Sequence, residues 1–341
     1  MDAKMIRHSA PTLGDAEAEA VTEVLRSGQL AQGKQVEAFE QECAAFVGRK
    51  YGVAVSSGTA ALHLALAALG VTENSIVALP TYACAALATA VQMQRGTSAL
   101  CDVGPDYNLD LGTLPEEVDV SIAAHLFGAT ASLPKSGSCI EDIAQSLGGD
   151  TGTATDVAIA SFYATKLMTT GEGGMLLTDD ADLAAFARDR RDYDNRDDWL
   201  PRYSYKMTDM QAAMGRVQLQ RLPGFIARRR EIAQQYLDAF RELPIELPGG
   251  SGHVFFRFVI RTDQRKALEG RLADAGVEAK RPVYRPAHLY ARDPSGRLHF
   301  QLRDAYPGAD AAHAQALSLP IYPSLLEEDV AHVIDSVRRN M

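Results

Sequence analysis

A lysine between two apolar stretches is the residue of this chain best suited to covalent chemistry. Lys166 follows the run Val157–Phe162, which predicts a buried strand, and precedes a turn of small residues and the run Met175–Leu177. Burial disfavours the charged ammonium form, so a lysine in this setting is expected to have a lowered pKa. A neutral amine can condense with a carbonyl group to form a Schiff base. A lysine in a surface loop would explain the same residue without any chemistry.

A carboxylate upstream gives this lysine a specific chemical context. Asp142 ends a short apolar stretch within Cys139–Gln145, and it lies 24 residues before Lys166. Enzymes that use pyridoxal phosphate (PLP) place a carboxylate opposite the pyridine nitrogen, because the negative charge keeps that nitrogen protonated and lets the ring accept electrons. Asp142 and Lys166 together therefore predict a PLP site.

A turn of small residues further upstream could hold the phosphate of such a cofactor. Ser57, Gly58 and Thr59 follow a predicted strand over Tyr51–Val55 and open an apolar helix. The first turn of a helix exposes backbone N–H groups and the positive end of the helix dipole, which suits an anion. Ser161, five residues before Lys166, could donate a hydrogen bond to the same phosphate.

These motifs, taken in order, resemble the DegT/DnrJ/EryC1/StrS family of sugar aminotransferases, which belong to the fold-type-I PLP enzymes. The resemblance covers nearly the whole chain and is carried by Ser27–Gly33, Phe39-Glu40, Ser57–Leu62, Leu79–Tyr82, Ala124–Gly128, Glu141–Gln145, Ser161–Lys166, Gly171–Gly174, Met207–Ala213 and Leu317–Pro323. So many motifs in the family's order identify the chain as a member far more specifically than any one of them.

The resemblance implies a role for each matching residue. Lys166 would bind PLP as a Schiff base, and Asp142 would pair with the pyridine nitrogen. Gln145 would lie near the ring hydroxyl, and Tyr82 would stack on the face of the ring. The cofactor-binding set then comprises Ser57, Gly58, Thr59, Tyr82, Asp142, Gln145, Ser161 and Lys166. His125 would lie near the cofactor and is a candidate substrate-binding residue; the alternative is a hydrogen-bonded structural histidine.

The resemblance also implies the reaction. An amino acid, with glutamate as the expected donor, would leave its amino group on the cofactor as pyridoxamine phosphate, and a keto sugar, nucleotide-linked in the usual case, would then receive it. Two alternatives stay open. Relatives that dehydrate sugars with PLP replace the lysine with histidine, so Lys166 argues against them. A PLP-binding regulatory or sensory protein without turnover is the other alternative.

The resemblance further implies a homodimer with composite active sites. In the family, the segment before the Met207–Ala213 motif crosses to the partner subunit, where an asparagine contacts the partner's cofactor phosphate and an arginine follows. Here Ser204 and Lys206 occupy these positions. Ser204 is expected to reach the phosphate less well, and Lys206 lacks the bidentate fork of arginine. The mixed-charge stretch Arg188–Asp198 is read as a solvated loop or as part of this crossing.

Composition excludes several classes of function. A net charge of −10 and an isoelectric point near 5.3 leave no electrostatic footprint for nucleic acid or anionic membranes. No apolar run reaches the roughly 18 residues of a membrane span. The four cysteines, Cys43, Cys84, Cys101 and Cys139, lack the spacing of zinc ligands and are expected to be buried thiols in the cytoplasm, with no metal site.

The elements that would position these residues alternate between strand and helix, which predicts an α/β fold with a mainly parallel sheet. The resemblance makes the sheet seven-stranded, in a large domain over residues 1–240, with a smaller C-terminal α+β domain over residues 241–341. Strands are expected around Val53, Val77, Ala99, Ile122, Ala158 and Leu176, and at 254–260. Helices are expected over 15–27, 34–47, 208–222, 224–243, 264–275 and 327–339, with Arg228-Arg229-Arg230 on a solvated helix face.

Overall fold

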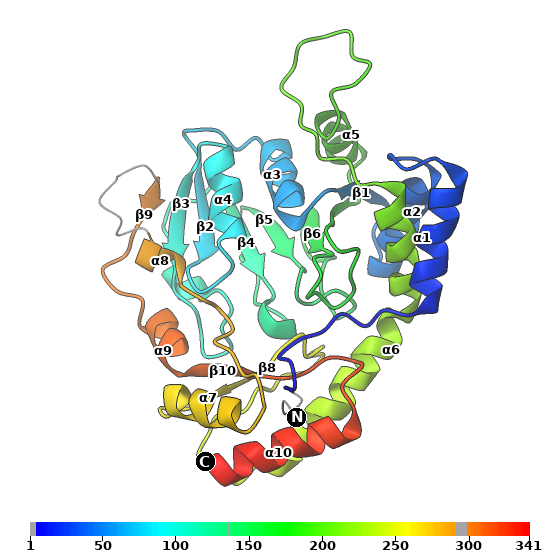
Figure 1. The fold of residues 1–341 in the computed structure, drawn as a ribbon. Helices are drawn as coiled ribbons and strands as arrows, with labels where there is room; N and C mark the ends of the chain where they lie inside the picture. Colours follow the sequence, from blue (N-terminus) through cyan, green and yellow to red (C-terminus); the bar gives the residue numbers. More distant parts are fainter. Residues whose placement is uncertain (1–4, 136, 291–298) are drawn as a thin grey trace.

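A large sheet forms the centre of the computed structural model, which describes residues 5–135, 137–290 and 299–341 (Figure 1). Its strand order is β1-β7-β6-β5-β4-β2-β3-β9, and only β7 runs antiparallel to its neighbours. The strands are β1 (Tyr51–Val55), β2 (Ile76–Pro80), β3 (Thr97–Cys101), β4 (Val120–Ala124), β5 (Ser138–Asp142), β6 (Val157–Ser161), β7 (Gly174–Thr178) and β9 (Phe300–Gln301). The mainly parallel sheet is confirmed, and the two-residue strand β9 at its edge makes it eight-stranded rather than seven-stranded.

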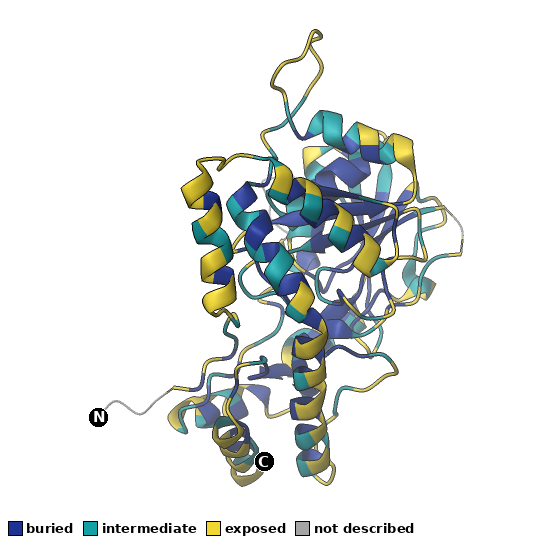
Figure 2. Cartoon of the chain, turned by 90° about the vertical axis from the view of Figure 1, so that its right-hand side faces the viewer, coloured by how far each residue is buried: buried dark blue, intermediate teal, exposed yellow. Residues whose placement is uncertain are grey.

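Helices cover both faces of this sheet, so most residues of its strands are buried, except in the edge strand β9 (Figure 2). One face carries α3 (Gly58–Ala68), α4 (Ala86–Met93) and α5 (Ala181–Arg190), and the other carries α1 (Asp15–Ser27), α2 (Lys34–Val47) and the first part of α6 (Asp209–Phe240). Successive strand residues point to opposite faces. Accordingly, Val53 and Leu176 pack in the core beneath α3, whereas Ala54 and Leu177 pack in the core beneath α2 and α6.

A smaller, two-stranded sheet with its own helices lies below the large sheet in Figure 1. It contains an antiparallel pair of strands, β8 (Phe258–Arg261) and β10 (Ala316–Leu319), with α7 (Arg265–Asp274) and α10 (Glu327–Asn340). Its hydrophobic cluster includes Phe258 and Leu317 but also Ile6 and the second half of α6, from Ile232 to Phe240. A division of the chain at residue 240 stays a prediction. The remaining elements are α8 (Ala287–Tyr290), α9 (Pro307–Gln315) and the 3-10 turns at Leu111–Thr113 and Leu126–Gly128.

Two predicted elements differ in the structure. The helices expected on either side of Pro223 are one helix, α6, which runs through the proline. Both halves bury apolar side chains, Leu219 and Leu222 in one core and Tyr236 and Phe240 in the other, and this packing outweighs the roughly 3 kcal/mol cost of an interior proline. The strand expected at 254–260 begins only at Phe258, because Phe255 has a positive φ of 48° that breaks an extended run.

The ends of the first two helices are predicted correctly, and so are the strands around Val53, Val77, Ala99, Ile122, Ala158 and Leu176. The helices 15–27 and 34–47 are found with the expected bounds, and Gly28 and Gly48 follow them in the left-handed conformation with φ of 74° and 88°. Glycine adopts this conformation without a steric penalty, which explains why these two stops can be read locally. None of the helices in the described ranges has both the length and the apolar character needed to cross a bilayer.

Candidate active site

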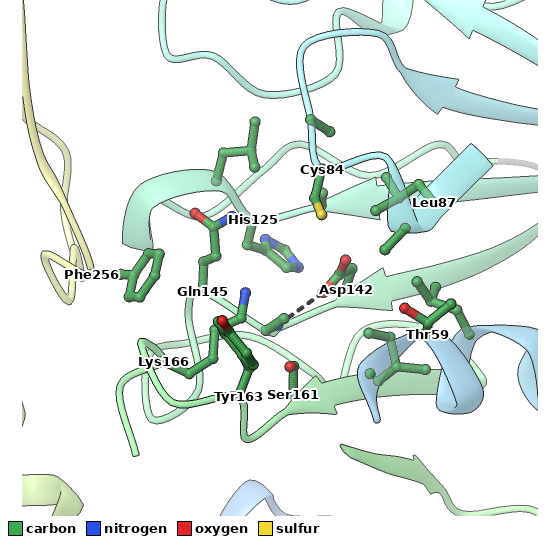
Figure 3. Close-up of a pocket in the computed structure, with 18 of the residues that line it drawn as sticks. Thr59, Cys84, Leu87, His125, Asp142, Gln145, Ser161, Tyr163, Lys166 and Phe256 are labelled. Carbon is green, nitrogen blue, oxygen red and sulfur yellow. Dashed lines mark hydrogen bonds between the residues drawn. The ribbon is translucent and has the colours of Figure 1, made fainter. Parts of the chain in front are cut away.

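The carboxyl ends of three neighbouring parallel strands deliver the predicted chemistry to one place. His125 follows β4, Asp142 ends β5 and Ser161 ends β6, while the N-terminus of α3 lies on the same side (Figure 3). In open α/β sheets, ligand sites form where parallel strands end and the chain turns into loops. The cavity here has a volume of about 390 Å³. Eight predicted site residues line it, namely Ser57, Gly58, Thr59, His125, Asp142, Gln145, Ser161 and Lys166.

Lys166 lies at the centre of this cavity. Burial lowers the pKa of its amine, while Asp142 and Cys84 act to raise it and Arg257 lowers it further. The expected depression of the pKa is therefore confirmed in direction. Nζ lies 5.4 Å from the centroid of the Phe256 ring, and no hydrogen bond ties it to another described residue. A desolvated amine of this kind is available both as a nucleophile and as a base.

Asp142 is buried, with 8% of its surface exposed. Its Oδ1 accepts a hydrogen bond of 2.9 Å from the Ala144 backbone N–H. Burial raises the pKa of this carboxyl, while Lys166 and the Ala144 N–H oppose the change. The second oxygen, Oδ2, has no donor among the described residues. An acceptor left over in a buried site is what a protonated pyridine nitrogen requires.

The N-terminus of α3 and the end of β6 form a cradle for an anion. Ser57 caps the helix, its Oγ accepting a 3.1 Å hydrogen bond from the Ala60 N–H. The N–H groups of Gly58 and Thr59 are the first of the helix and have no acceptor within it. A Cβ on Gly58 would lie 2.8 Å from the Ser161 Cβ, so only glycine allows the helix to approach β6 this closely. The cradle fits the phosphate of PLP.

Gln145 and His125 line the same cavity. The Gln145 Oε1 accepts a hydrogen bond of 2.9 Å from the Phe127 N–H, which leaves its amide N–H groups for the cavity. Both ring nitrogens of His125 are occupied: Nδ1 accepts from the Ala131 N–H at 2.9 Å, and Nε2 donates to Glu141 at 3.2 Å. Burial raises the pKa of Glu141, but the His125 bond and two backbone N–H groups lower it to about 2. His125 is thus a hydrogen-bonded wall residue, with no ring nitrogen left for a substrate.

Three predicted residues are not brought to this cavity. Tyr82 is fully buried: its ring stacks on Tyr107 at a centroid distance of 6.0 Å, and its hydroxyl donates to the Ala312 carbonyl at 3.4 Å. Its neighbour along the chain, Cys84, lines the cavity instead. Ser204 is exposed, and Lys206 forms ion pairs of 2.6 Å with Asp192 and Asp194.

Several lining residues were not singled out from the sequence. They are Cys84, Tyr163, Thr165, Glu172, Phe256 and Arg257. Cys84 was expected to be a buried thiol, but it is exposed, whereas the other three cysteines are buried. The only sequence signal for Phe256 and Arg257 was that 253–257 departs from the usual pattern of the family, which pointed to substrate choice without giving a role.

A buried lysine, an opposed aspartate and a phosphate cradle at the strand ends of this fold define a PLP-dependent aminotransferase site. The chain belongs to the DegT/DnrJ/EryC1/StrS aminotransferase family, which matches residues 11–338.

Named relatives agree with this assignment. The chain is 32% identical to the spore coat polysaccharide biosynthesis protein SpsC of Bacillus subtilis (strain 168), over 97% of this chain and 96% of that protein. It is 30% identical to GDP-perosamine synthase of Escherichia coli O157:H7, over 96% of both. The crystal structure of S. venezuelae DesV in complex with a ketimine intermediate superposes with a TM-score of 0.88 at 30% identity, covering 95% of this chain and 93% of that one.

Proposed function

We propose that this protein transfers an amino group from glutamate to a keto sugar carried by a nucleotide. The single observation that carries the catalytic part is the placement of Lys166 and Asp142 in one cavity with the cradle of Gly58, Thr59 and Ser161. Membership of the family supports the aminotransferase class. A relative named GDP-perosamine synthase, alike over nearly its full length, supports a nucleotide-linked sugar as the acceptor.

Each of these residues has a task that follows from its surroundings. Bound in the cavity, PLP would supply a carbonyl that exchanges amino groups and a ring that takes up the electron pair released at the substrate carbon. Asp142 would hold a proton on the pyridine nitrogen through Oδ2. The N–H groups of Gly58 and Thr59, with the Ser161 hydroxyl, would bind the phosphate. Lys166, whose pKa is lowered by burial, would take a proton from the substrate carbon and deliver it to the cofactor carbon.

Spectroscopy of the purified holoprotein tests this proposal. Glutamate alone is expected to bleach the visible absorption of the lysine-bound cofactor and to release 2-oxoglutarate. A nucleotide keto sugar from a panel is then expected to restore the absorption. Borohydride reduction should fix the cofactor to the peptide that carries Lys166. A label on Lys135 or Lys206, or on no lysine, would contradict the assignment.

The same experiment separates the two alternative functions. A regulatory protein would bind PLP at Lys166 but show no bleaching with any amino acid. A sugar dehydratase would release a dehydrated sugar instead of an amino sugar, and mass spectrometry of the product distinguishes the two. A lysine at position 166, where the sugar dehydratases have a histidine, favours transfer of the amino group over dehydration.

We also propose that the working unit is a cytoplasmic homodimer whose sites are completed by the partner. The segment between α5 and α6 projects from the body of the chain (Figure 1), and it carries the fully exposed Trp199 together with Tyr193 and Leu200. Exposed aromatic side chains of this kind favour burial against another surface. Ser204 and Lys206 would then approach the partner's cofactor phosphate, with Lys206 leaving its aspartate partners.

The mass of the protein in solution tests the dimer, and the rate of cofactor loss from two Ser204 variants tests the contact across it. Light scattering should give the mass of a dimer, and a fully active monomer would contradict the composite site. Ser204→Asn is expected to slow the loss of cofactor on dialysis about tenfold, because the longer amide adds a hydrogen bond to a charged group. Ser204→Ala serves as the matched control and is expected to lose cofactor at least as fast as the wild type.

A further inference from the structure

A guanidinium group in the wall of the active-site cavity has no carboxylate partner among the described residues. Arg257 lines the cavity together with Lys166, and these two are its lysine and arginine side chains. The side-chain hydrogen bond of Arg257 is a long one, 3.4 Å from Nη1 to the His8 Nδ1. The Arg257 Cζ lies 4.6 Å from the centroid of the Phe256 ring. Its Nε and Nη2 have no acceptor in the described part of the chain.

The groups around Arg257 do not neutralise it. Burial, Arg257 itself and Lys280 lower the pKa of His8 to about 3, so this histidine is neutral. Two carboxylates on segments near Arg257 are engaged elsewhere: Glu246 pairs with Arg261 at 3.6 Å, and Glu278, next to His8, pairs with Lys280 at 2.7 Å. Burial lowers the pKa of Arg257 to about 10, which still leaves it charged at neutral pH. The cavity wall at this point is therefore positive.

The backbone on both sides of Arg257 is held in a fixed position. Arg229 donates from Nη1 to the carbonyls of Phe255, Phe256 and Ile321 at 3.3, 3.2 and 2.8 Å. The Arg257 N–H donates to the Phe127 carbonyl at 3.2 Å, and the Val254 N–H donates to the Gly128 carbonyl at 3.0 Å.

The approach of this segment to β4 and its following turn is as close as glycine permits. A Cβ on Gly128, which has a φ of 102°, would lie 2.8 Å from the Phe255 nitrogen. Phe255 itself adopts a φ of 48°, a strained value for an aromatic residue. A cation held in a cavity wall without a counter-ion is unfavourable, so a frame that keeps one in place is expected to serve a ligand.

We propose that Arg257 binds a carboxylate of the amino-acid donor, which rests on the function proposed above. The fork of an arginine matches a carboxylate with two parallel hydrogen bonds. Lys166 Nζ lies 5.4 Å and Arg257 Cζ 4.6 Å from the centroid of the same Phe256 ring, and all three residues line one cavity. Every α-amino acid carries a carboxylate beside the amino group that would have to reach the cofactor held at Lys166. Arg257 would thus orient the donor, and Phe256 would form the floor between the two cations.

Two variants and two measurements test this subsite. Arg257→Gln removes the charge, and Arg257→Lys keeps it without the fork. In the donor step, followed as bleaching by limiting glutamate, we expect the rate to fall about tenfold to a hundredfold in Arg257→Gln, as for a lost hydrogen bond to a charged group, and less in Arg257→Lys. Glutarate, which has the carboxylates but no amino group, is titrated into the holoenzyme by calorimetry. Its affinity should fall by a similar factor, independently of any turnover.

A neighbouring arginine supplies the matched control. Arg261 lines an adjoining cavity, and its guanidinium is already engaged by Glu246 at 3.6 Å and by Gln315 at 3.1 Å. Arg261→Gln is expected to leave the donor step and the glutarate affinity unchanged. Unaltered glutarate binding in both Arg257 variants, or a loss confined to the step with the sugar, would overturn the subsite alone. A wild-type protein that no amino acid bleaches would overturn the proposed function as well.

Discussion

The two walls of the active-site cavity are built in different ways. The wall beneath the cofactor position consists of strand ends and a helix N-terminus, and it carries Asp142, Ser161 and Thr59. The opposite wall is the irregular segment 253–257, which Arg229 holds in place through backbone carbonyls. The first wall contains groups suited to one cofactor. The second wall places Arg257, which has no carboxylate partner among the described residues, in the lining of the cavity. The comparison teaches that Asp142, Ser161 and Thr59, predicted to hold the cofactor, lie at the ends of regular elements, whereas the proposed donor subsite lies on an irregular segment in which Phe255 has a positive φ.

The largest effect is expected from the first wall. Asp142→Asn keeps the shape of the side chain and removes the charge that would hold a proton on the pyridine nitrogen. We expect turnover to fall by about a hundredfold or more, the range seen when a single electrostatic stabiliser is removed from an active site. Circular dichroism should show an unchanged fold, and cofactor should still bind. Near-normal turnover would remove Asp142 from the catalytic wall.

The second wall is expected to respond to its support. Arg229→Met leaves the carbonyls of Phe255, Phe256 and Ile321 without their donor, at about 1–3 kcal/mol for each buried unsatisfied group. Chemical denaturation should therefore show a clear loss of unfolding free energy, together with a higher KM for the donor because Arg257 is displaced. Arg339→Met, at an exposed helix end, is the control and should stay within about 0.5 kcal/mol of the wild type. Equal stabilities of the two variants would show that segment 253–257 does not depend on Arg229.

Acid should weaken the second wall before the first. Burial and neighbouring cations lower the pKa of His8 to about 3 and that of His253 to about 4, from an ordinary 6.5. The unfolded chain then binds more protons than the folded one between these values, so the unfolding free energy falls as pH drops below 6.5, by at most about 1.4 kcal/mol per pH unit for each histidine.

The first wall has a different acid range. Glu141, with a pKa of about 2 against an ordinary 4.5, loses its contribution only as pH falls below 4.5. The folded chain holds His8 neutral at a pH where the unfolded chain protonates it, so His8 contributes to the pH dependence above pH 4. Thermal melts between pH 4 and 6.5 should become less pH-dependent in His8→Gln. If the slope of that variant equals the wild-type slope, His8 is already protonated in the folded protein.

The smallest effect concerns Cys84, an exposed thiol that lines the cavity. Burial raises the pKa of Cys43 and Cys139 to about 12 and that of Cys101 to about 11, whereas Cys84 is exposed in the cavity. Dithionitrobenzoate is expected to titrate a single thiol in the native apoprotein, and Cys84→Ser should abolish that signal. Bound cofactor should slow the reaction. A reaction rate that is indifferent to cofactor would place the bound cofactor away from Cys84.

Much of the first wall could be predicted because its signals are local. Lys166, Asp142 and the turn at Ser57–Thr59 each lie at a junction that apolar runs and small residues mark along the chain. The stops at Gly28 and Gly48 are local for the same reason, since a left-handed residue ends a helix whatever surrounds it. The order of these motifs was enough to indicate the fold, the cofactor and the family.

The sequence could not show which face a residue takes once distant segments meet. Tyr82 was expected at the cofactor, but its ring fits the core beside Tyr107, and Cys84 lines the cavity in its place. Arg229 was expected on a solvated helix face, but it is 4% exposed and holds segment 253–257. Local pattern thus determined the elements and their chemistry. Tertiary packing decided that α6 continues through Pro223, that Arg229 is buried and that Arg257 lines the same cavity as Lys166, because each depends on contacts between residues far apart in the chain.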